Sequence, residues 1–305
     1  MGFLKQLLRT MRPSQSIVEE QDLHMLCLIL EWRAETETLS RTRTAPREDP
    51  SETAERLSAR AASLSVPELR NVVKRHVERQ VRGLVVDPSG GAFKLDVKPS
   101  SIPSAGRGVF AIGNAAPGQV VALMPGLVYA KAHHRDIPGY PSFGNESMLM
   151  MSRHDGHVID SRAFERFNTS NDSMREYNAA RRKRDGQCGV DSLWFHPGLR
   201  EHPSPLALGH IINHPPSGTS PNVLPAPVDW RDTDVSRIPW SLYKVGGSAD
   251  PAVPAVVPGL AFVATRSIEH DQELFVNYRL NPGVVGGLPK WYEAVDSEED
   301  ALRWE

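Results

Sequence analysis

The chain is poor in cysteine, in long apolar runs and in excess charge of either sign. Cys27 and Cys188 are the 2 cysteines among 305 residues, too few and too far apart for a disulfide framework or a zinc site of clustered thiolates. This cysteine content fits a reducing compartment. No apolar run reaches the roughly 20 residues that a membrane-spanning helix needs, so we expect no membrane span.

The charge balance argues against a nucleic-acid partner. Lysine and arginine total 35 against 37 acidic residues, which gives a formal net charge of -2 and an isoelectric point near 6.6. Because proteins that bind duplexes usually carry a basic excess, no direct nucleic-acid partner is expected. Residues 1–16 contain three cations and no acid. This pattern weakly resembles an organelle presequence, although an amphipathic helix is the simpler interpretation. Nuclear, cytoplasmic and organellar locations stay open, as does the oligomeric state.

Residues 1–90 are predicted to form a helical N-terminal region. Apolar residues recur at helical spacing over residues 17–39, which predicts an amphipathic helix. Residues 40–58 are polar, charged and interrupted by two prolines, which is typical of a linker. Ser65 followed by Glu68 forms a capping-box pattern and predicts the start of a second helix.

From residue 91 onward, short apolar runs between glycine- and proline-rich turns replace the helical pattern, which is typical of strands. The expected strands cover residues 108–112, 120–124, 127–130, 148–152, 157–160, 260–266 and 272–280. A short helix with Ser204 as its cap is expected over residues 205–213. The pattern predicts a mostly β (α+β) protein with a helical N-terminal region.

Two long stretches are interpreted as insertions in this β region. Residues 162–202 are polar and basic, and residues 225–258 are rich in proline. Long loops inside a compact domain are usually functional or disordered. The basic run Arg181–Arg184 fits a nuclear import signal, a patch for an acidic partner or a solvated loop. Residues 281–305 are expected to form a C-terminal tail.

Three short motifs carry the chemistry, and each is weak alone. Gly106 and Gly108 let the backbone approach a ligand closely, but the third glycine of a dinucleotide fingerprint is missing. His210 and His214 have a spacing that suits a metal on a helix, yet the glutamate of the zincin motif is absent, so no metal is expected. Tyr278 alone would be an aromatic residue at the edge of the core.

Taken in order, the motifs Gly106-Arg-Gly108, Asn213-His214 with Pro221-Asn222, and Glu273-Leu-x-x-x-Tyr278 closely resemble the SET domain of protein lysine methyltransferases. Ile159-Asp160 and the stretch from Ala264 to Leu274 extend the resemblance, which covers residues 91–280. It implies a fold of small curved sheets with a C-terminal pseudoknot, in which the tyrosine segment passes beneath the Asn213-His214 loop. It also implies methyl transfer from S-adenosyl-L-methionine to the side-chain amine of a lysine in a protein substrate.

The resemblance also assigns site residues. It implies a cofactor site formed by Gly106, Arg107, Gly108, Phe110, Asn213, His214 and Tyr278. Asn213 and His214 would fix the amine and the adenine, and the hydroxyl oxygen of the catalytic residue Tyr278 would lie beside the transferred methyl. Val276 would line the substrate channel and leave room for higher methylation states; the alternative is that it only packs the strand.

Several departures from the family pattern are visible. The loop after Asn213-His214 is three residues longer than usual, and Asn277 stands where the family commonly has aspartate. No cysteine cluster follows Tyr278, so a zinc-bound lid cannot form. Residues 281–305, with Trp291 among their aromatics, either close the channel instead or form a loose tail. A catalytically inactive SET fold that binds or scaffolds, and a small-molecule methyltransferase, are the alternative functions.

Overall fold

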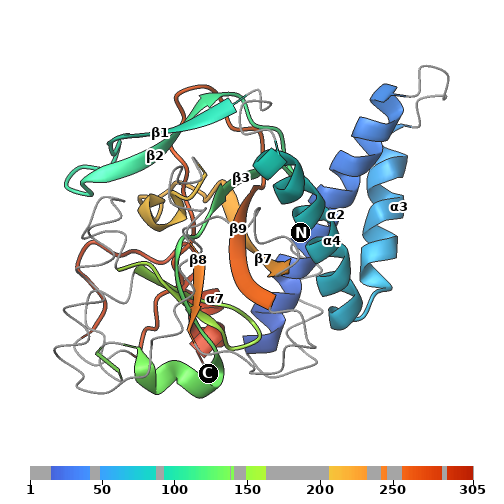
Figure 1. Cartoon of the computed structure of the whole chain (residues 1–305). Coiled ribbons are helices and arrows are strands. Elements are labelled where there is room, and N and C mark those ends of the chain that lie inside the picture. Colours follow the sequence, from blue (N-terminus) through green and yellow to red (C-terminus); the bar gives the residue numbers. More distant parts are fainter. Residues whose placement is uncertain are drawn as a thin grey trace.

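The computed structural model describes residues 15–41, 49–86, 93–137, 139–140, 149–162, 206–231, 242–245, 256–283 and 287–304. Within these residues the protein is a mixed α+β structure, in which N-terminal helices stand beside small, mostly antiparallel sheets (Figure 1). The presequence-like residues 1–14, the capping residue Ser204 and nearly all of the 162–202 insertion lie outside the described residues. No helix in the described part of the chain is long and apolar enough to cross a membrane.

Three helices make up the described N-terminal region: α2 (Gln15–Arg41), α3 (Pro50–Ala62) and α4 (Val66–Val86). Helix α2 confirms the first predicted helix. The capping prediction for α4 is also confirmed, because the backbone N–H and the hydroxyl of Ser65 donate to Glu68 Oε2 at 2.8 and 2.6 Å. A carboxylate in this position satisfies a donor that the first helical turn leaves unpaired.

The predicted linker over residues 40–58 is wrong for much of its length. Helix α3 begins at Pro50, and the side chain of Asp49 caps it by accepting from the backbone N–H of Ser51 at 2.8 Å. Proline fits the first position of a helix, where its missing N–H costs nothing, so here it starts a helix rather than breaking one. The charges of this stretch pair with α2, as in the bidentate contact of Arg56 with Glu35 at 2.7 and 3.0 Å.

Nine strands in the described residues form three sheets. They are β1 (Phe93–Pro99), β2 (Arg107–Gly113), β3 (Val120–Leu123), β4 (Gly126–Tyr129), β5 (Met150–Ser152), β6 (Val158–Asp160), β7 (Val223–Arg231), β8 (Leu242–Val245) and β9 (Val256–Ala264). The strand orders are β1-β2, β3-β9-β7 and β5-β6-β4-β8, and β4 with β8 is the one parallel pair among them. Six expected strands are confirmed as β2 to β6 and β9, whereas β1, β7 and β8 were not predicted.

The interpretation of residues 225–258 as an inserted loop is wrong at both ends of that stretch. Strand β7 covers its beginning and pairs with β9 over nine residues. Pro225 and Pro227 lie opposite Phe262 and Leu260, on alternate residues of β7, which is an edge strand. Proline is tolerated on an edge strand where its nitrogen points away from the neighbouring strand, so this spacing is compatible with a regular ladder.

The helix expected over residues 205–213 is only a 3-10 turn, η5 (Gly209–Ile211), in the described residues from 206 onward. The backbone here bonds to a neighbouring strand as well as within its own short turns, since the carbonyl of Leu206 accepts from the N–H of Leu123 at 2.7 Å. A Cβ at Gly209 would lie 2.8 Å from the carbonyl oxygen of Leu123. Close packing against β3 therefore replaces the helix.

The N-terminal helices and the sheets share one hydrophobic core. Leu69, Val73 and Val77 of α4 are fully buried in the same cluster as Val263 of β9. Helix α4 packs against β7, and α2 packs against both α3 and α4 (Figure 1). Residues before 90 are thus part of the packing that supports the sheets.

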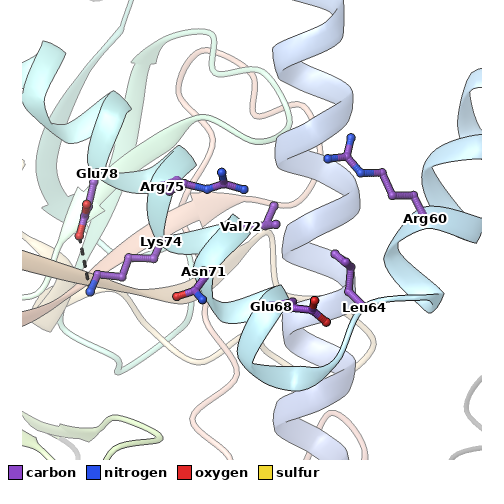
Figure 2. A pocket seen from close by; sticks show the side chains of 8 residues that line it. All are labelled: Arg60, Leu64, Glu68, Asn71, Val72, Lys74, Arg75 and Glu78. Atoms are coloured by element: carbon purple, nitrogen blue, oxygen red, sulfur yellow. Dashed lines mark ion pairs between the residues drawn. The ribbon is translucent and has the colours of Figure 1, made fainter.

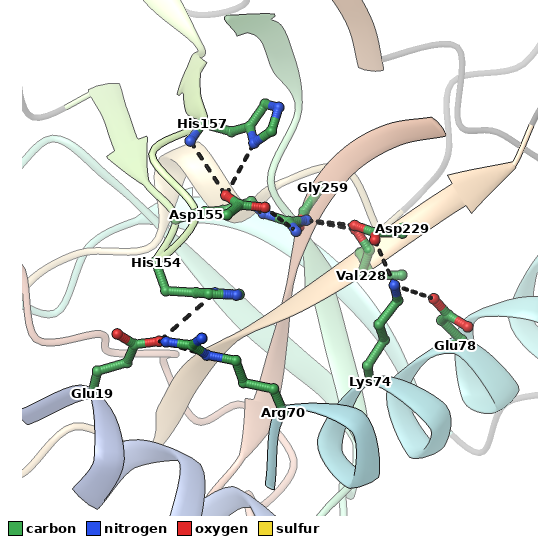
Figure 3. A network of polar contacts seen from close by, with 11 residues as sticks. Glu19, Arg70, Lys74, Glu78, His154, Asp155, His157, Val228, Asp229 and Gly259 are labelled. Atoms are coloured by element: carbon green, nitrogen blue, oxygen red, sulfur yellow. Dashed lines mark hydrogen bonds and ion pairs between the residues drawn. The ribbon is translucent and has the colours of Figure 1, made fainter. Parts of the chain in front are cut away.

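A polar network joins the same two parts of the molecule (Figure 3). Arg153 in the turn after β5 is buried and donates to the carbonyls of Val228 and Gly259 at 2.9 and 2.8 Å. Lys74 of α4 pairs with Asp229 of β7 at 2.6 Å. A buried charge such as Arg153 needs these partners. The partly exposed pair of Lys74 and Asp229 links α4 to the edge strand β7.

Candidate functional site

The three sequence motifs meet at the segment around Glu273. Glu273 pairs antiparallel with Phe110 of β2, and Phe275 pairs parallel with Asn213. The N–H of Leu274 donates to the carbonyl of Val109 at 2.8 Å, and that of Val276 donates to the carbonyl of Asn213 at 3.0 Å. The segment therefore lies between β2 and the Asn213-His214 loop.

The strand predicted over residues 272–280 is wrong as a continuous strand. The segment forms isolated pairings with different neighbours on its two sides. Asn222 supplies a further substitute for a strand: its side chain donates to the carbonyl of Glu273 at 2.8 Å and accepts from the N–H of Phe275 at 2.7 Å. Because its neighbours change every two residues, no regular ladder can form. Asn222 is fully buried, which explains the Pro221-Asn222 motif.

Glu273 is the polar centre of the site, and the sequence interpretation gave it no role. It is 4% exposed and accepts hydrogen bonds from Ser100 Oγ at 2.7 Å, Ser101 N at 2.8 Å, Ser101 Oγ at 2.5 Å and Asn213 Nδ2 at 3.0 Å. A buried carboxylate needs this many donors to offset its lost hydration. The available signal was one acid directly before the apolar run Leu274 to Val276.

The two positions of the first motif require glycine for different structural reasons. Gly106 has a φ of 75°, and a Cβ added there would meet no atom within 4 Å, so the space beside it is open. Gly108 is buried, and a Cβ there would overlap Glu273 Oε1. The close approach that was predicted at this motif is therefore made, at Gly108, by the chain's own carboxylate.

The other predicted residues of β2 take part through backbone and stacking contacts. The carbonyl of Arg107 accepts from Asn213 Nδ2 at 2.8 Å. The ring of Phe110 is covered by Lys98, whose Nζ lies 4.5 Å from the ring centre.

Burial, and secondly the charge of Arg107, lower the pKa of His210 to about 4, so this imidazole is neutral at pH 7.

Asn213 connects the first two motifs. Its amide nitrogen donates to Ser100 Oγ at 3.2 Å in addition to the contacts with Arg107 and Glu273. The amide oxygen has no hydrogen bond to the described residues. It is thus an acceptor without a partner among these residues, on a side chain whose amide nitrogen bonds to the residue after Gly106.

His214 uses both ring nitrogens inside the protein. Nε2 donates to the carbonyl of Glu293 at 2.7 Å, and Nδ1 accepts from the backbone N–H of Tyr278 at 3.2 Å. Burial lowers the pKa of His214, which favours the neutral ring that this pattern requires. Its side chain therefore cannot also bind adenine or a metal, and a hydrogen bond from its backbone to the hydroxyl of Tyr278 partly opposes the rise in the pKa of that phenol.

The metal geometry considered for the two histidines does not form. The 3-10 turn ends at Ile211, so His210 and His214 do not lie one helical turn apart. The described residues also contain no group of three or more His, Cys, Asp or Glu side chains that could bind a metal.

Tyr278 lies against the backbone of the second motif. Its hydroxyl donates to the carbonyl of Ile212 at 3.0 Å, and the ring of Trp291 stands edge-on to it at 6.3 Å. Burial raises the pKa of Tyr278 to about 12, so the phenol stays protonated at neutral pH. The side chain of Val276 is 2% exposed and belongs to the main hydrophobic core. This burial is compatible with the alternative that Val276 only packs its segment. Its effect on methylation state stays a prediction.

The described part of the C-terminal tail is docked on the site. Residues 287–304 include helix α7 (Ser297–Trp304), which packs against α2. The ring of Tyr292 lies 4.6 Å from that of His214, and its hydroxyl donates to Asp300 at 2.5 Å. Trp291, 54% exposed, covers the edge of Tyr278.

One pocket lies away from these residues, between α3 and α4 (Figure 2). Its volume is about 560 Å³, and it is lined by Arg60, Leu64, Glu68, Asn71, Val72, Lys74, Arg75 and Glu78. None of the predicted site residues lines it, and its wall carries charges of both signs. It therefore selects no particular ligand charge.

Comparison with known proteins finds no matching family model and no curated protein that is significantly similar to the chain.

Proposed function

We propose that the protein is an S-adenosyl-L-methionine-dependent methyltransferase of the SET class that methylates a lysine side chain of a protein substrate. The observation that carries the proposal is the direct contact of Asn213 with Arg107 and of His214 with Tyr278. Within the SET family, the sequence resembles most the branch of SET domain-containing protein 9. The proposed fold is accordingly a SET domain, with the Glu273 to Tyr278 segment as its pseudoknot.

Polar and open groups of the three motifs fit the proposed cofactor. The open space at Gly106 leaves backbone accessible. The free amide oxygen of Asn213 suits an ammonium group, and the backbone carbonyl of His214 would offer an acceptor for adenine. Gly108 would act indirectly, because Glu273 occupies the space next to it. When bound, S-adenosyl-L-methionine would supply a methyl group on a positively charged sulfur.

The chain's contribution to methyl transfer would be positioning. The lysine amine must be neutral to attack, although its ordinary pKa is about 10.4, so an apolar approach path that disfavours the ammonium promotes the reaction. In-line contact of nitrogen, methyl and sulfur then depends on a fixed geometry.

Tyr278 is suited to orient the reacting groups without forming a covalent bond. Its hydroxyl hydrogen points to the carbonyl of Ile212, and the backbone of His214 makes a second hydrogen bond to the hydroxyl. One oxygen lone pair is then left to accept a weak C–H contact from a polarised methyl. Because burial keeps its pKa near 12, the phenol would not act as the base at neutral pH.

Methyl transfer tests the proposal directly. Wild-type protein and Tyr278→Phe are incubated with radiolabelled S-adenosyl-L-methionine and a protein mixture, and label is counted in protein and in the low-mass fraction. We expect label on protein lysine, reduced about a hundredfold or more in Tyr278→Phe. Equal labelling by both proteins would overturn the role of Tyr278. Cofactor binding without transfer would favour an inactive binding module, and label only in small molecules would favour a small-molecule methyltransferase.

A further inference from the structure

Arg279, the residue directly after Tyr278, is tied to both ends of the chain. Its guanidinium is 8% exposed and makes a bidentate contact with Asp22 of α2, at 2.5 and 2.8 Å. The same guanidinium lies 2.5 Å from Glu299 of α7. One side chain therefore joins an N-terminal helix, a C-terminal helix and the segment of the proposed catalytic tyrosine.

The backbone of the same turn is also fixed. Arg279 has a φ of 48°, in the left-handed region that non-glycine residues seldom adopt. Its carbonyl accepts from Trp304 Nε1 at 2.8 Å, and the N–H of Leu280 donates to the hydroxyl of Tyr292 at 3.2 Å. Such a backbone conformation persists only where its surroundings determine it strongly.

The electrostatics of Arg279 indicate that its ion pairs fix the geometry of the turn rather than add much stability. Burial alone would lower the pKa of the guanidinium, but the carboxylates of Asp22 and Glu299 outweigh burial and raise it. A buried ion pair is seldom more stabilising than apolar packing of the same volume. The planar guanidinium of Arg279 is directional, however, and a carboxylate that binds it in a bidentate manner fixes both the position and the orientation of the guanidinium.

We propose that Arg279 is a positioning residue for Tyr278, and that α2 is thereby a working part of the site rather than an appendage. The inference rests on the proposed function for its catalytic meaning. The N–H of Tyr278 bonds to His214, and its hydroxyl bonds to Ile212. A shift of the turn at Arg279 would move both contacts and misplace the hydroxyl.

Asp22→Asn is the main test, and Glu19→Gln is its matched control. Both residues lie on α2, and Glu19 makes its own ion pair with Arg70 of α4 at 2.6 Å, whereas the carboxylates paired with Arg279 are those of Asp22 and Glu299. We expect Asp22→Asn to lower kcat about tenfold or more with little change in KM for the cofactor. Glu19→Gln should keep wild-type kcat. Equal losses of kcat in both variants would overturn the proposal.

Amide hydrogen exchange provides a readout that does not depend on activity. The amides of Val276, Tyr278 and Leu280 donate to Asn213, His214 and Tyr292 respectively. Relative to the wild type, we expect Asp22→Asn to speed exchange more at Tyr278 and Leu280 than at Val276. Glu19→Gln should cause no such change. Unchanged exchange at Tyr278 and Leu280 would refute positioning, whereas a wild type that neither binds nor uses the cofactor would refute only the proposed function.

A double variant separates positioning from general destabilisation. Arg279→Lys retains the charge but loses the planar guanidinium, so it should reproduce the kcat loss of Asp22→Asn. In an Arg279→Met background, Asp22→Asn should cause no further loss of kcat, because the contact is already absent. A full additional loss there would show that Asp22 acts independently of Arg279 and would contradict the proposal.

Discussion

The two halves of the segment from Glu273 to Leu280 are fixed in different ways. The first half, Glu273 to Phe275, is bound by hydroxyl, amide and backbone groups of β2 and of the loops that contain Ser100 and Asn222. The second half, Tyr278 to Leu280, is bound by His214 and by residues from α2 and the C-terminal segment.

The first half of the segment is therefore held by the core itself, whereas the second half is held only while α2 and the C-terminal segment are docked. Glu273, Leu274 and Phe275 are themselves buried, so their contacts involve groups that the fold must satisfy in any case. Contacts of the second half depend on the docking of α2 and of residues 287–304. Changes in the first half should therefore lower stability most, and changes in the second half should mainly alter the geometry at Tyr278.

Gly108→Ala should cause the largest loss of stability. The new Cβ would overlap the buried carboxylate of Glu273, and we expect a loss of about 3 kcal/mol in the free energy of unfolding. Gly106→Ala, which adds a methyl in open space at a positive φ, should cost only about 1 kcal/mol. Urea denaturation of the two variants measures both values, and equal losses would contradict the role assigned to Glu273.

Glu273→Gln should have the next largest effect. The amide would place its own N–H donors against some of the hydroxyl, amide and backbone donors that the carboxylate now accepts, at a cost of about 2 kcal/mol. Glu269→Gln in the neighbouring exposed turn is the control and should unfold like the wild type. A melting temperature for Glu273→Gln equal to that of the control would contradict the claim that contacts of the first half contribute most to stability.

Acid should loosen the second half before the first. Because burial lowers the pKa of His214, its stabilising contribution is complete above the ordinary histidine value of about 6.5 and is lost as pH falls through the lowered pKa. Protonation would replace the acceptor at Nδ1 by a donor that faces the N–H of Tyr278. Asp300 in the same cluster partly opposes the shift.

Amide exchange at pH 7 and pH 5 measures this effect. We expect Tyr278 to lose protection at the lower pH while Leu274, whose partner is the carbonyl of Val109, keeps it. His210 also titrates in acid, with a pKa of about 4, so exchange is compared at pH 5 rather than lower. Equal loss of protection at both amides would mean that the two halves are not separate.

Local features of the fold could be predicted from the sequence, whereas features that depend on distant partners could not. The capping pair of Ser65 and Glu68 spans three residues, so its pattern is readable. The donors of Glu273 at Ser101 are 172 residues away, and the contact of Arg279 with Asp22 spans 257 residues. No spacing rule connects such positions, and without a partner in view Glu273 and Arg279 resemble surface charges.

The motif order gave the candidate site but not the use of each group. Asn213, His214 and Tyr278 do meet, yet the ring of His214 is fully used by Tyr278 and Glu293. The residues after 281 include a docked segment because Tyr292 and Trp304 satisfy backbone groups of the tyrosine turn. These bonds depend on tertiary packing, which aromatic content alone does not reveal.

Calorimetric titration of the full chain with S-adenosyl-L-methionine tests most directly whether the space at Gly106 is a cofactor site. Gly287 is a matched control for Gly106, since both have a positive φ, 78° and 75°, and open space at the Cβ position. We expect saturable binding at one site by the wild type and by Gly287→Ala, and binding about tenfold or more weaker in Gly106→Ala. No saturable binding by the folded wild type, or equal weakening in both variants, would contradict a cofactor site at Gly106.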